Sequence, residues 1–374
     1  MKKIHPVDLS SLTPMEVSLR IPRLLGKLSD SSLDAVIITN LTNVRYLTSF
    51  TGSAAILAVK KTGESCIFTD GRYELQVQRE LQCSSVDIQI EVGSPKIQSK
   101  QLVKFVKNCK RIGLEGQNIP WDSVSKMAKL FEGSDIVSAG TPVEELRVIK
   151  DLGEVARIEK ACQCADVAFK NIRNLFIPGV SELDLTVQLD FEIRLCGASG
   201  NSFSTIVASG PNGALPHAKP TDRKFVEGDL IVCDFGSQVD GYCSDMTRTV
   251  SVGEPNKKLK EIYDIVLSAQ VLGVNSVKSG VTTTKVDNAC RKFISDSGFK
   301  DKFTHSTGHG VGLDIHELPW VASSFSTKLK ENMVITVEPG IYIEDLGGVR
   351  IEDTLVVTTD GSRTLTNTTK DMVA

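Results

Sequence analysis

Two ten-residue segments of this chain repeat one pattern, and this repeat constrains the fold more than any other feature. Residues 227–236 read Glu-Gly-Asp-Leu-Ile-Val-Cys-Asp-Phe-Gly, and residues 331–340 read Glu-Asn-Met-Val-Ile-Thr-Val-Glu-Pro-Gly. The two segments align without a gap, and each is followed by a turn signal and a second strand-like run that ends on further acids. This internal duplication predicts two structurally similar halves.

Each repeat predicts a β-hairpin that carries acids on both strands. A turn signal at residues 238–241 stands midway between Asp234 and Asp245, so these acids are expected to oppose each other across an antiparallel ladder. A second turn signal stands between Glu338 and Glu352. A pseudo-twofold relation between the hairpins would gather four carboxylates, and four like charges at close range need cations between them.

Histidines cluster in one short segment of the second half. His305, His309 and His316 lie within thirteen residues, and His217 stands alone in a Leu-Pro-His sequence. Imidazole binds metals and transfers protons near neutral pH, so this clustering indicates a site rather than packing. Glycines on both sides of His309 leave room for a close approach of backbone or ligand.

The four carboxylates and His309 form a predicted set of metal ligands that is mostly oxygen. Such a set suits Mn²⁺ better than a closed tetrahedral zinc site, with Co²⁺ or Zn²⁺ as alternatives. Two ions that share bridging carboxylates would lower the pKa of a water between them towards about 7. A carboxylate could take its proton while histidines stabilise a developing oxyanion, which is the chemistry of amide hydrolysis.

Six motifs resemble, in order, the proline-specific branch of the methionine aminopeptidase-like metallopeptidases, which have the pita-bread fold. They are Leu-Pro-His at 215–217, Asp-Phe-Gly at 234–236, Ser-Asp-Met-Thr-Arg at 244–248, the histidine segment at 305–317, Val-Glu-Pro-Gly at 337–340 and Gly-Val-Arg-Ile-Glu-Asp at 348–353. Ser306 stands where methionine aminopeptidases carry an aromatic residue or Met.

The resemblance implies how two divalent metal ions would be held. Asp234 and Asp245 would bind one ion, while His309 and Glu338 would complete the second site. Asp245 and Glu352 would bridge the two ions, and Glu338 would also be the catalytic proton shuttle. Creatinase shares the fold but lacks these ligands, whereas all five positions here keep side chains that can bind metal.

The resemblance also implies roles for residues around the metals. His217, His305 and His316 would be catalytic residues that line the pocket and contact the scissile carbonyl and the proline side of the substrate. Arg350 is placed on the strand face opposite Glu352, where it would brace the ligands. Arg248 has a similar spacing after Asp245 and could brace the ligands in the same way, but an exposed charge on a strand is an equally good interpretation.

The activity expected from the resemblance is that of an Xaa-Pro aminopeptidase, which removes the residue before proline from peptides with proline in the second position. The alternative is an Xaa-Pro dipeptidase (prolidase), which must recognise the free carboxylate beside proline. Some dipeptidases use an arginine shortly after the His-Glu pair, but this chain has Trp320 in that region, which favours the aminopeptidase. A non-catalytic peptide-binding module on the same fold is a remote alternative.

The whole chain predicts an α/β N-terminal domain of the creatinase/prolidase type at 1–138 and an α+β pita-bread domain at 143–374. In the second domain, two helix pairs should cover one curved antiparallel sheet. Expected helices are at 17–28, 97–108, 121–131, 143–174, 259–278 and 284–297, and expected strands at 33–39, 54–59, 65–69, 86–92 and 111–114.

Composition excludes several classes of partner. A net charge of −3 gives no basis for binding nucleic acid or an anionic membrane. No run approaches the about 20 apolar residues of a membrane span. Nine scattered cysteines and the lack of an apolar signal-peptide region predict a cytoplasmic protein. The resemblance implies a homodimer or a higher homo-oligomer.

Overall fold

The computed structural model describes residues 7–29 and 31–373. The chain forms two compact units, one of Glu16–Arg147 and one of Val148–Ala374 with the stretch up to Met15. The α/β and pita-bread architectures expected from the sequence are both confirmed. The division into domains at 138 and 143 stays a prediction, and the compact units place the helix Pro142–Arg147 with the first unit.

The first unit is built on one mixed sheet, in the order β4-β3-β2-β1-β5-β6. Its strands are β1 Ala35–Ile38, β2 Ala55–Lys60, β3 Ser65–Thr69, β4 Gln89–Val92, β5 Arg111–Leu114 and β6 Asp135–Ser138. Its helices are α1 Arg20–Ser29, α2 Leu41–Thr48, α3 Glu74–Ser84, α4 Pro95–Phe105, α5 Trp121–Leu130 and α6 Pro142–Arg147. Strands β2 and β3 form the predicted antiparallel hairpin, while β1 pairs with β5 in parallel.

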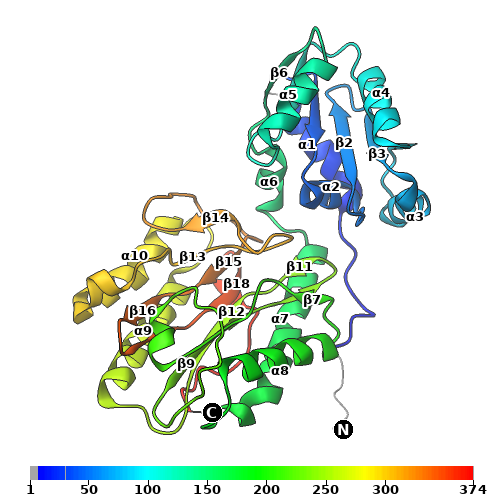
Figure 1. Ribbon diagram of the computed structural model, residues 1–374. Coiled ribbons are helices and arrows are strands. Elements are labelled where there is room, and N and C mark those ends of the chain that lie inside the picture. The colour runs from blue at the N-terminus through cyan, green and yellow to red at the C-terminus, as the bar shows by residue number, and fades with distance from the viewer. Residues whose placement is uncertain (1–6, 30, 374) are drawn as a thin grey trace. The chain divides into compact units, whose positions relative to one another are not determined.

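The second unit contains two helix pairs, which follow the predicted duplication. They are α7 Leu152–Ile172 with α8 Glu182–Leu195, and α9 Lys257–Ser276 with α10 Thr283–Ile294 (Figure 1). Capping boxes begin α7 at Asp151 and α8 at Ser181, because each cap side chain accepts a backbone N–H and an acid three residues on reaches back. The apolar faces of these helices are buried against the strands.

The predicted continuous helix at 143–174 is interrupted at residues 148–151. Lys150 lies in the break, where its backbone N–H donates to Asn332 O at 3.0 Å. Its ammonium forms a buried ion pair with Glu317 Oε1 at 2.7 Å. Because the Lys150 N–H donates to Asn332 O, it cannot donate to the carbonyl four residues earlier as a continuous helix requires. Asp151 then caps the start of α7.

The strands of the second unit form several small sheets. Their orders are β11-β10-β7, β12-β9-β8, β14-β13-β15-β18-β19 and β16-β17. The strands are β7 Gly200–Asn201, β8 Ile206–Ser209, β9 Leu230–Phe235, β10 Ser237–Val239, β11 Tyr242–Cys243, β12 Met246–Ser251, β13 Gly308–Gly310, β14 Glu317–Val321, β15 Val334–Val337, β16 Gly340–Ile343, β17 Gly347–Arg350, β18 Asp353–Val357 and β19 Ser362–Thr364.

The register of the first hairpin differs from the prediction. Asp234 on β9 pairs with Thr247 on β12, not with Asp245. The turn residues are Asp240 and Gly241, both with positive φ (45° and 77°), so the turn lies one residue further along the chain than its predicted centre. A shift of two in the pairing keeps all these side chains on one face, so the acids still gather. In the second hairpin the pairs Gly340–Arg350 and Val337–Asp353 bracket Glu338 and Glu352, which therefore lie opposite each other as predicted.

Candidate metal centre

A cavity of about 450 Å³ opens within the second unit, and all nine predicted site residues line it. Its lining comprises Phe203, Ser204, Ile206, Pro216, His217, Asp234, Asp245, His305, Ser306, His309, Ile315, His316, Trp320, Glu338, Arg350 and Glu352. These residues come from both duplicated halves. The structure therefore brings together side chains that lie more than 100 positions apart in the sequence.

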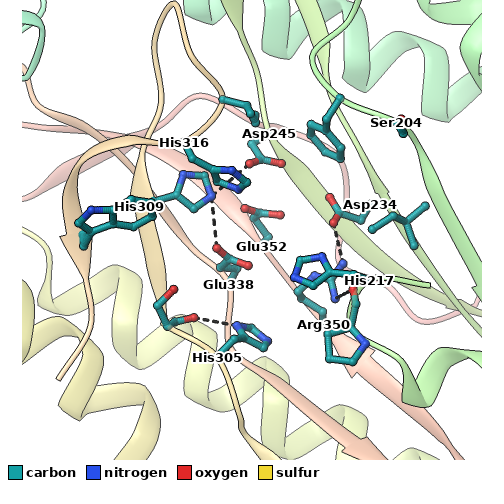
Figure 2. Close-up of a pocket in the computed structure, with 16 residues that line it drawn as sticks. Ser204, His217, Asp234, Asp245, His305, His309, His316, Glu338, Arg350 and Glu352 are labelled. Carbon is teal, nitrogen blue, oxygen red and sulfur yellow. Dashed lines mark hydrogen bonds and ion pairs between the residues drawn. The ribbon is translucent and has the colours of Figure 1, made fainter. Parts of the chain in front are cut away.

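The predicted ligands face the same part of this cavity, with Asp234 beside Arg350 at its edge (Figure 2). Possible ligand atoms of Asp245, His309 and Glu352 all lie within 4.8 Å of one another. His309 Nε2 lies 3.4 Å from Asp245 Oδ2 and 3.4 Å from Glu338 Oε1. Thr247 donates its hydroxyl hydrogen to Glu352 Oε2 at 2.7 Å, which orients that carboxylate.

The imidazole of His309 is arranged as a metal ligand would be. Its Nδ1 lies 3.0 Å from the carbonyl oxygen of Gly310, so Nδ1 carries the hydrogen and Nε2 presents its lone pair to the carboxylates. Burial lowers the pKa of His309 to about 4, so the ring is neutral at pH 7. A lone pair that faces carboxylate oxygens is repelled by them unless a cation lies between.

Glycines on both sides of His309 are needed for this placement. A Cβ at Gly308 would lie 2.1 Å from Thr336 O, and one at Gly310 would lie 2.2 Å from Leu318 O. Strand β13 can therefore lie between β14 and β15 only because these residues lack side chains. The close backbone approach expected around His309 is confirmed.

Burial and mutual repulsion act together on the carboxylates. Burial, followed by the charges of Glu352 and Asp234, raises the pKa of Asp245 well above its usual range. Burial raises the pKa of Glu338 to about 8, and it also raises the pKa of Glu352. Bound cations would offset both the burial of these carboxylates and their mutual repulsion, because they neutralise the cluster and replace lost water contacts.

Asp234 supplies a further indication that the site is built for a cation. Its Oδ2 accepts a hydrogen bond from Arg350 at 2.6 Å, whereas its Oδ1 is buried and has no hydrogen-bond partner within residues 7–29 and 31–373. A buried carboxylate oxygen without a partner is costly and needs an explanation. A divalent ion in the cavity would provide the missing partner, so the donor set fits such ions.

Arg350 lies in the cavity, so the expectation that it faces away from Glu352 is wrong. Residues two apart on a strand point to the same side, and this places both side chains in the site. Arg350 is 3% exposed. Its Nε donates to Thr247 Oγ1 at 3.1 Å, and its Nη1 donates to Tyr342 Oη at 2.8 Å and Pro216 O at 3.2 Å.

The three remaining histidines line the cavity in different ways. His305 is held by Ser306 O at 2.8 Å and by Tyr342 Oη at 2.9 Å, and burial with the nearby charge of Arg350 lowers its pKa to about 4. His316 lies edge-on to the ring of His309 at 4.4 Å between centroids and is exposed. His217 is also exposed at the cavity wall.

Several residues of this site were not among the predicted ones, and three of them show a signal that could have found them or a contact that matters. Tyr342 links Arg350 to His305, and the strand alternation 338, 340, 342 could have placed it on the same face as Glu338. Thr247 follows from the same alternation after Asp245. Trp320 lines the cavity with its ring 6.4 Å from that of His316.

Arg248 is not an exposed charge, so that interpretation is wrong. It is 2% exposed and pairs with Asp353 Oδ1 at 2.9 Å. It is absent from the cavity lining among the described residues and lies on the other side of its strand, as its odd spacing from Asp245 requires.

Comparison with known proteins shows the family of this chain. Residues 156–359 match the model of metallopeptidase family M24, and residues 20–149 match the Creatinase/Prolidase N-terminal domain. An uncharacterized peptidase, YqhT of Bacillus subtilis, is 40% identical over 355 residues, which cover 95% of this chain and 99% of the relative.

Solved structures show the same similarity over nearly all of the chain. An Xaa-Pro dipeptidase from Bacillus anthracis has a TM-score of 0.91 and 38% identity, covering 96% of this chain and 99% of its own. An X-Pro aminopeptidase from Thermotoga maritima has a TM-score of 0.85 and 34% identity, covering 95% and 100%. The predicted resemblance is thus confirmed, and the protein is a peptidase whose family implies divalent metal ions. The chain belongs to metallopeptidase family M24 and carries the Creatinase/Prolidase N-terminal domain.

Proposed function

We propose that this protein is an Xaa-Pro aminopeptidase, which removes the N-terminal residue from peptides with proline in the second position. The hydrogen bonds of Arg350 favour an aminopeptidase over a dipeptidase. It is the only Arg or Lys among the described residues that line the cavity, and hydrogen bonds to protein atoms engage all three of its nitrogens. Among the described lining residues, no Arg or Lys side chain is left to pair with the free carboxylate of a dipeptide.

The walls of the cavity support the same choice. Phe203, Ile315 and Trp320 give it apolar surfaces, which suit a proline ring and a continuing peptide chain better than a terminal charge. An Xaa-Pro dipeptidase is the second candidate, because the Bacillus anthracis structure with a TM-score of 0.91 carries that name.

We further propose that the site holds two divalent ions, with Mn²⁺ as the proposed metal and Co²⁺ or Zn²⁺ as alternatives. Asp234 and Asp245 would bind one ion, His309 and Glu338 the other, and Asp245 with Glu352 would bridge them. When bound, such ions supply Lewis acidity and a water of lowered pKa.

The chain's own residues would carry the proton transfers and the positioning. Glu338 lines the cavity with its carboxylate beside His309, where it would accept a proton from water and return it to the leaving amine. His316, exposed beside His309, would donate a hydrogen bond to the developing oxyanion. Tyr342 and Arg350 would hold His305 in place on the proline side.

The test compares two substrates of the Mn²⁺-loaded protein, an Xaa-Pro dipeptide and an Xaa-Pro-Xaa tripeptide, by following the free N-terminal amino acid. Cleavage of the tripeptide is expected and would identify an aminopeptidase. Cleavage of the dipeptide alone would mean that another residue reads the carboxylate and that the second candidate is correct.

The cytoplasmic location and the homo-oligomeric assembly stay predictions. Within the described part of the chain, none of the helices has the length and apolar character that crossing a bilayer requires.

A further inference from the structure

Arg248 lies behind the carboxylate cluster and contacts the backbone of a proposed ligand. Its Nη1 donates to the carbonyl oxygens of Thr247 at 2.9 Å and of Glu352 at 2.5 Å. The backbone N–H of Glu352 in turn donates to Thr247 O at 3.1 Å. One guanidinium thus ties the peptide unit of Glu352 to the neighbouring strand β12.

The same guanidinium binds the end of the chain. Its Nη2 donates to Thr368 O at 2.8 Å, and its Nε donates at 3.2 Å to the carbonyl oxygens of Thr368 and Thr369. Arg248 therefore bridges the strand that carries Glu352 and a segment at residues 366–370, here called the C-terminal clamp.

The C-terminal clamp has a second attachment one residue beyond Glu352. Asp353 is 1% exposed and receives Arg248 Nη2 at 2.9 Å. It is also bound by two side chains of the clamp, since Thr366 donates to its Oδ1 at 2.9 Å and Lys370 forms an ion pair with its Oδ2. Alternation on the strand points Asp353 away from the cavity and Glu352 into it.

The clamp is itself held by hydrogen bonds to two helices. Asp166 on α7 accepts hydrogen bonds from the backbone N–H groups of Asn367 at 2.9 Å and Thr368 at 2.8 Å. Tyr263 on α9 donates to the carbonyl oxygen of Lys370 at 2.6 Å. The clamp is thus anchored to a helix from each half of the unit, and it can transmit that rigidity to Arg248 and Asp353.

We propose that Arg248 and the C-terminal clamp are a positioning unit for the metal centre, which fixes Glu352 where the ions require it. This proposal rests on the proposed role of Glu352 as a ligand. The physical reason is that partners behind a ligand orient it, and their loss costs about 10- to 100-fold in metal affinity. An ordinary buried ion pair would stabilise the fold without this effect.

The experiment measures Mn²⁺ binding to the metal-free, full-length protein by titration calorimetry. Arg248→Lys keeps the charge but cannot reach two strands and the clamp together, and we expect metal affinity about 10- to 100-fold weaker. Lys370→Met removes one attachment to Asp353 and should weaken binding less. Arg363→Met is the control, because that arginine is 49% exposed and forms an ion pair at the surface with Glu159.

A second readout separates positioning from general stability. Melting temperatures are measured with and without Mn²⁺, together with the visible absorption spectrum of the Co²⁺-loaded protein. A positioning role predicts a smaller metal-induced rise in melting temperature and an altered spectrum in Arg248→Lys. Equal losses of melting temperature with and without metal, at unchanged affinity, would overturn the proposal.

Two variants make every outcome decisive. If Arg248→Lys does not fold, Lys370→Met decides alone, and an unchanged affinity and Co²⁺ spectrum in that variant would overturn the proposal. Glu352→Gln serves as the reference for the ligand itself. Unchanged metal binding in Glu352→Gln would refute the proposed metal site, whereas weakened binding there with normal binding in Arg248→Lys would refute only the positioning unit.

Discussion

Arg350 Nη2 donates to Asp234 Oδ2 across 2.6 Å, and this contact divides the two oxygens of one carboxylate between two tasks. Oδ2 is taken up by the guanidinium, while Oδ1 is buried without a partner in the described part of the chain. The carboxylate thus keeps one oxygen for a cation, and Arg350 fixes its orientation.

Replacing Arg350 by Lys should therefore impair the site although the charge is kept. A lysine ammonium cannot reach Asp234, Thr247 and Tyr342 together, because it lacks the planar fork of arginine. We expect about 10- to 100-fold lower kcat/KM and weaker Mn²⁺ binding. The same change at the exposed Arg363 is the control, and equal behaviour of the two variants would contradict the assignment.

Replacing Trp320 by Arg should shift the substrate preference towards dipeptides. The change puts a free cation on the cavity wall beside His316, where a dipeptide carboxylate can pair with it. A hydrogen bond to a charged group contributes about 1.5–3 kcal/mol, so the dipeptide-to-tripeptide ratio of kcat/KM should rise at least about tenfold. Trp320→Phe keeps an apolar ring and should leave the ratio unchanged. A fall in both rates without a change in ratio would argue against this role.

Replacing Glu338 by Gln should abolish turnover of the metal-loaded protein. The amide cannot accept the proton of the attacking water, and we expect a loss in kcat of at least about 10²- to 10⁴-fold. Glu331→Gln, an exposed position seven residues earlier, is the control for the same chemical change. Substantial hydrolysis by Glu338→Gln would exclude the proposed proton transfer.

The same variant should change how stability depends on pH when metal is removed by a chelator. Burial raises the pKa of Glu338 from 4.5 to about 8. As pH rises between these values, the unfolded chain ionises while the folded protein retains the proton, so the folded protein loses stability. Glu338→Gln removes this loss, worth up to about 1.4 kcal/mol per unit of pKa shift. Urea unfolding at pH 5, 6.5 and 8 should show the free energy of unfolding of the variant rising relative to that of the wild type. A difference between the two that does not change with pH would contradict the raised pKa.

Replacing Gly308 by Ala should displace β13 and with it His309. The added Cβ would lie 2.1 Å from Thr336 O, which is backbone and cannot move alone. We expect a loss of about 1–3 kcal/mol in the free energy of unfolding, together with weaker metal binding. Gly361 has no atom within 4 Å of the corresponding Cβ, so Gly361→Ala should leave both measurements nearly unchanged. Similar results for the two variants would mean that β13 accommodates the methyl group.

The sequence by itself determined which titratable residues line the site. The duplicated acid segments and the spacing of His305, His309 and His316 named seven residues, and two further motifs added His217 and Arg350. All nine line one cavity. Local pattern sufficed here because a strand's period of two and its glycines fix which side chains share a face and where backbone can approach. The opposition of Glu338 and Glu352 followed from the same reasoning.

Tertiary structure decided what lies behind that face. Arg248 is on the far side of its strand by alternation, but only the return of residues 366–370 covers it and joins it to Asp353. The pairing partner of Asp234 likewise depended on the turn, which lies one residue further along the chain than its predicted centre. Strand periodicity specifies the relative direction of neighbouring side chains. Contacts between segments more than 100 residues apart depend on packing. Whether the second face of a strand is buried or faces solvent is decided only when another segment covers it.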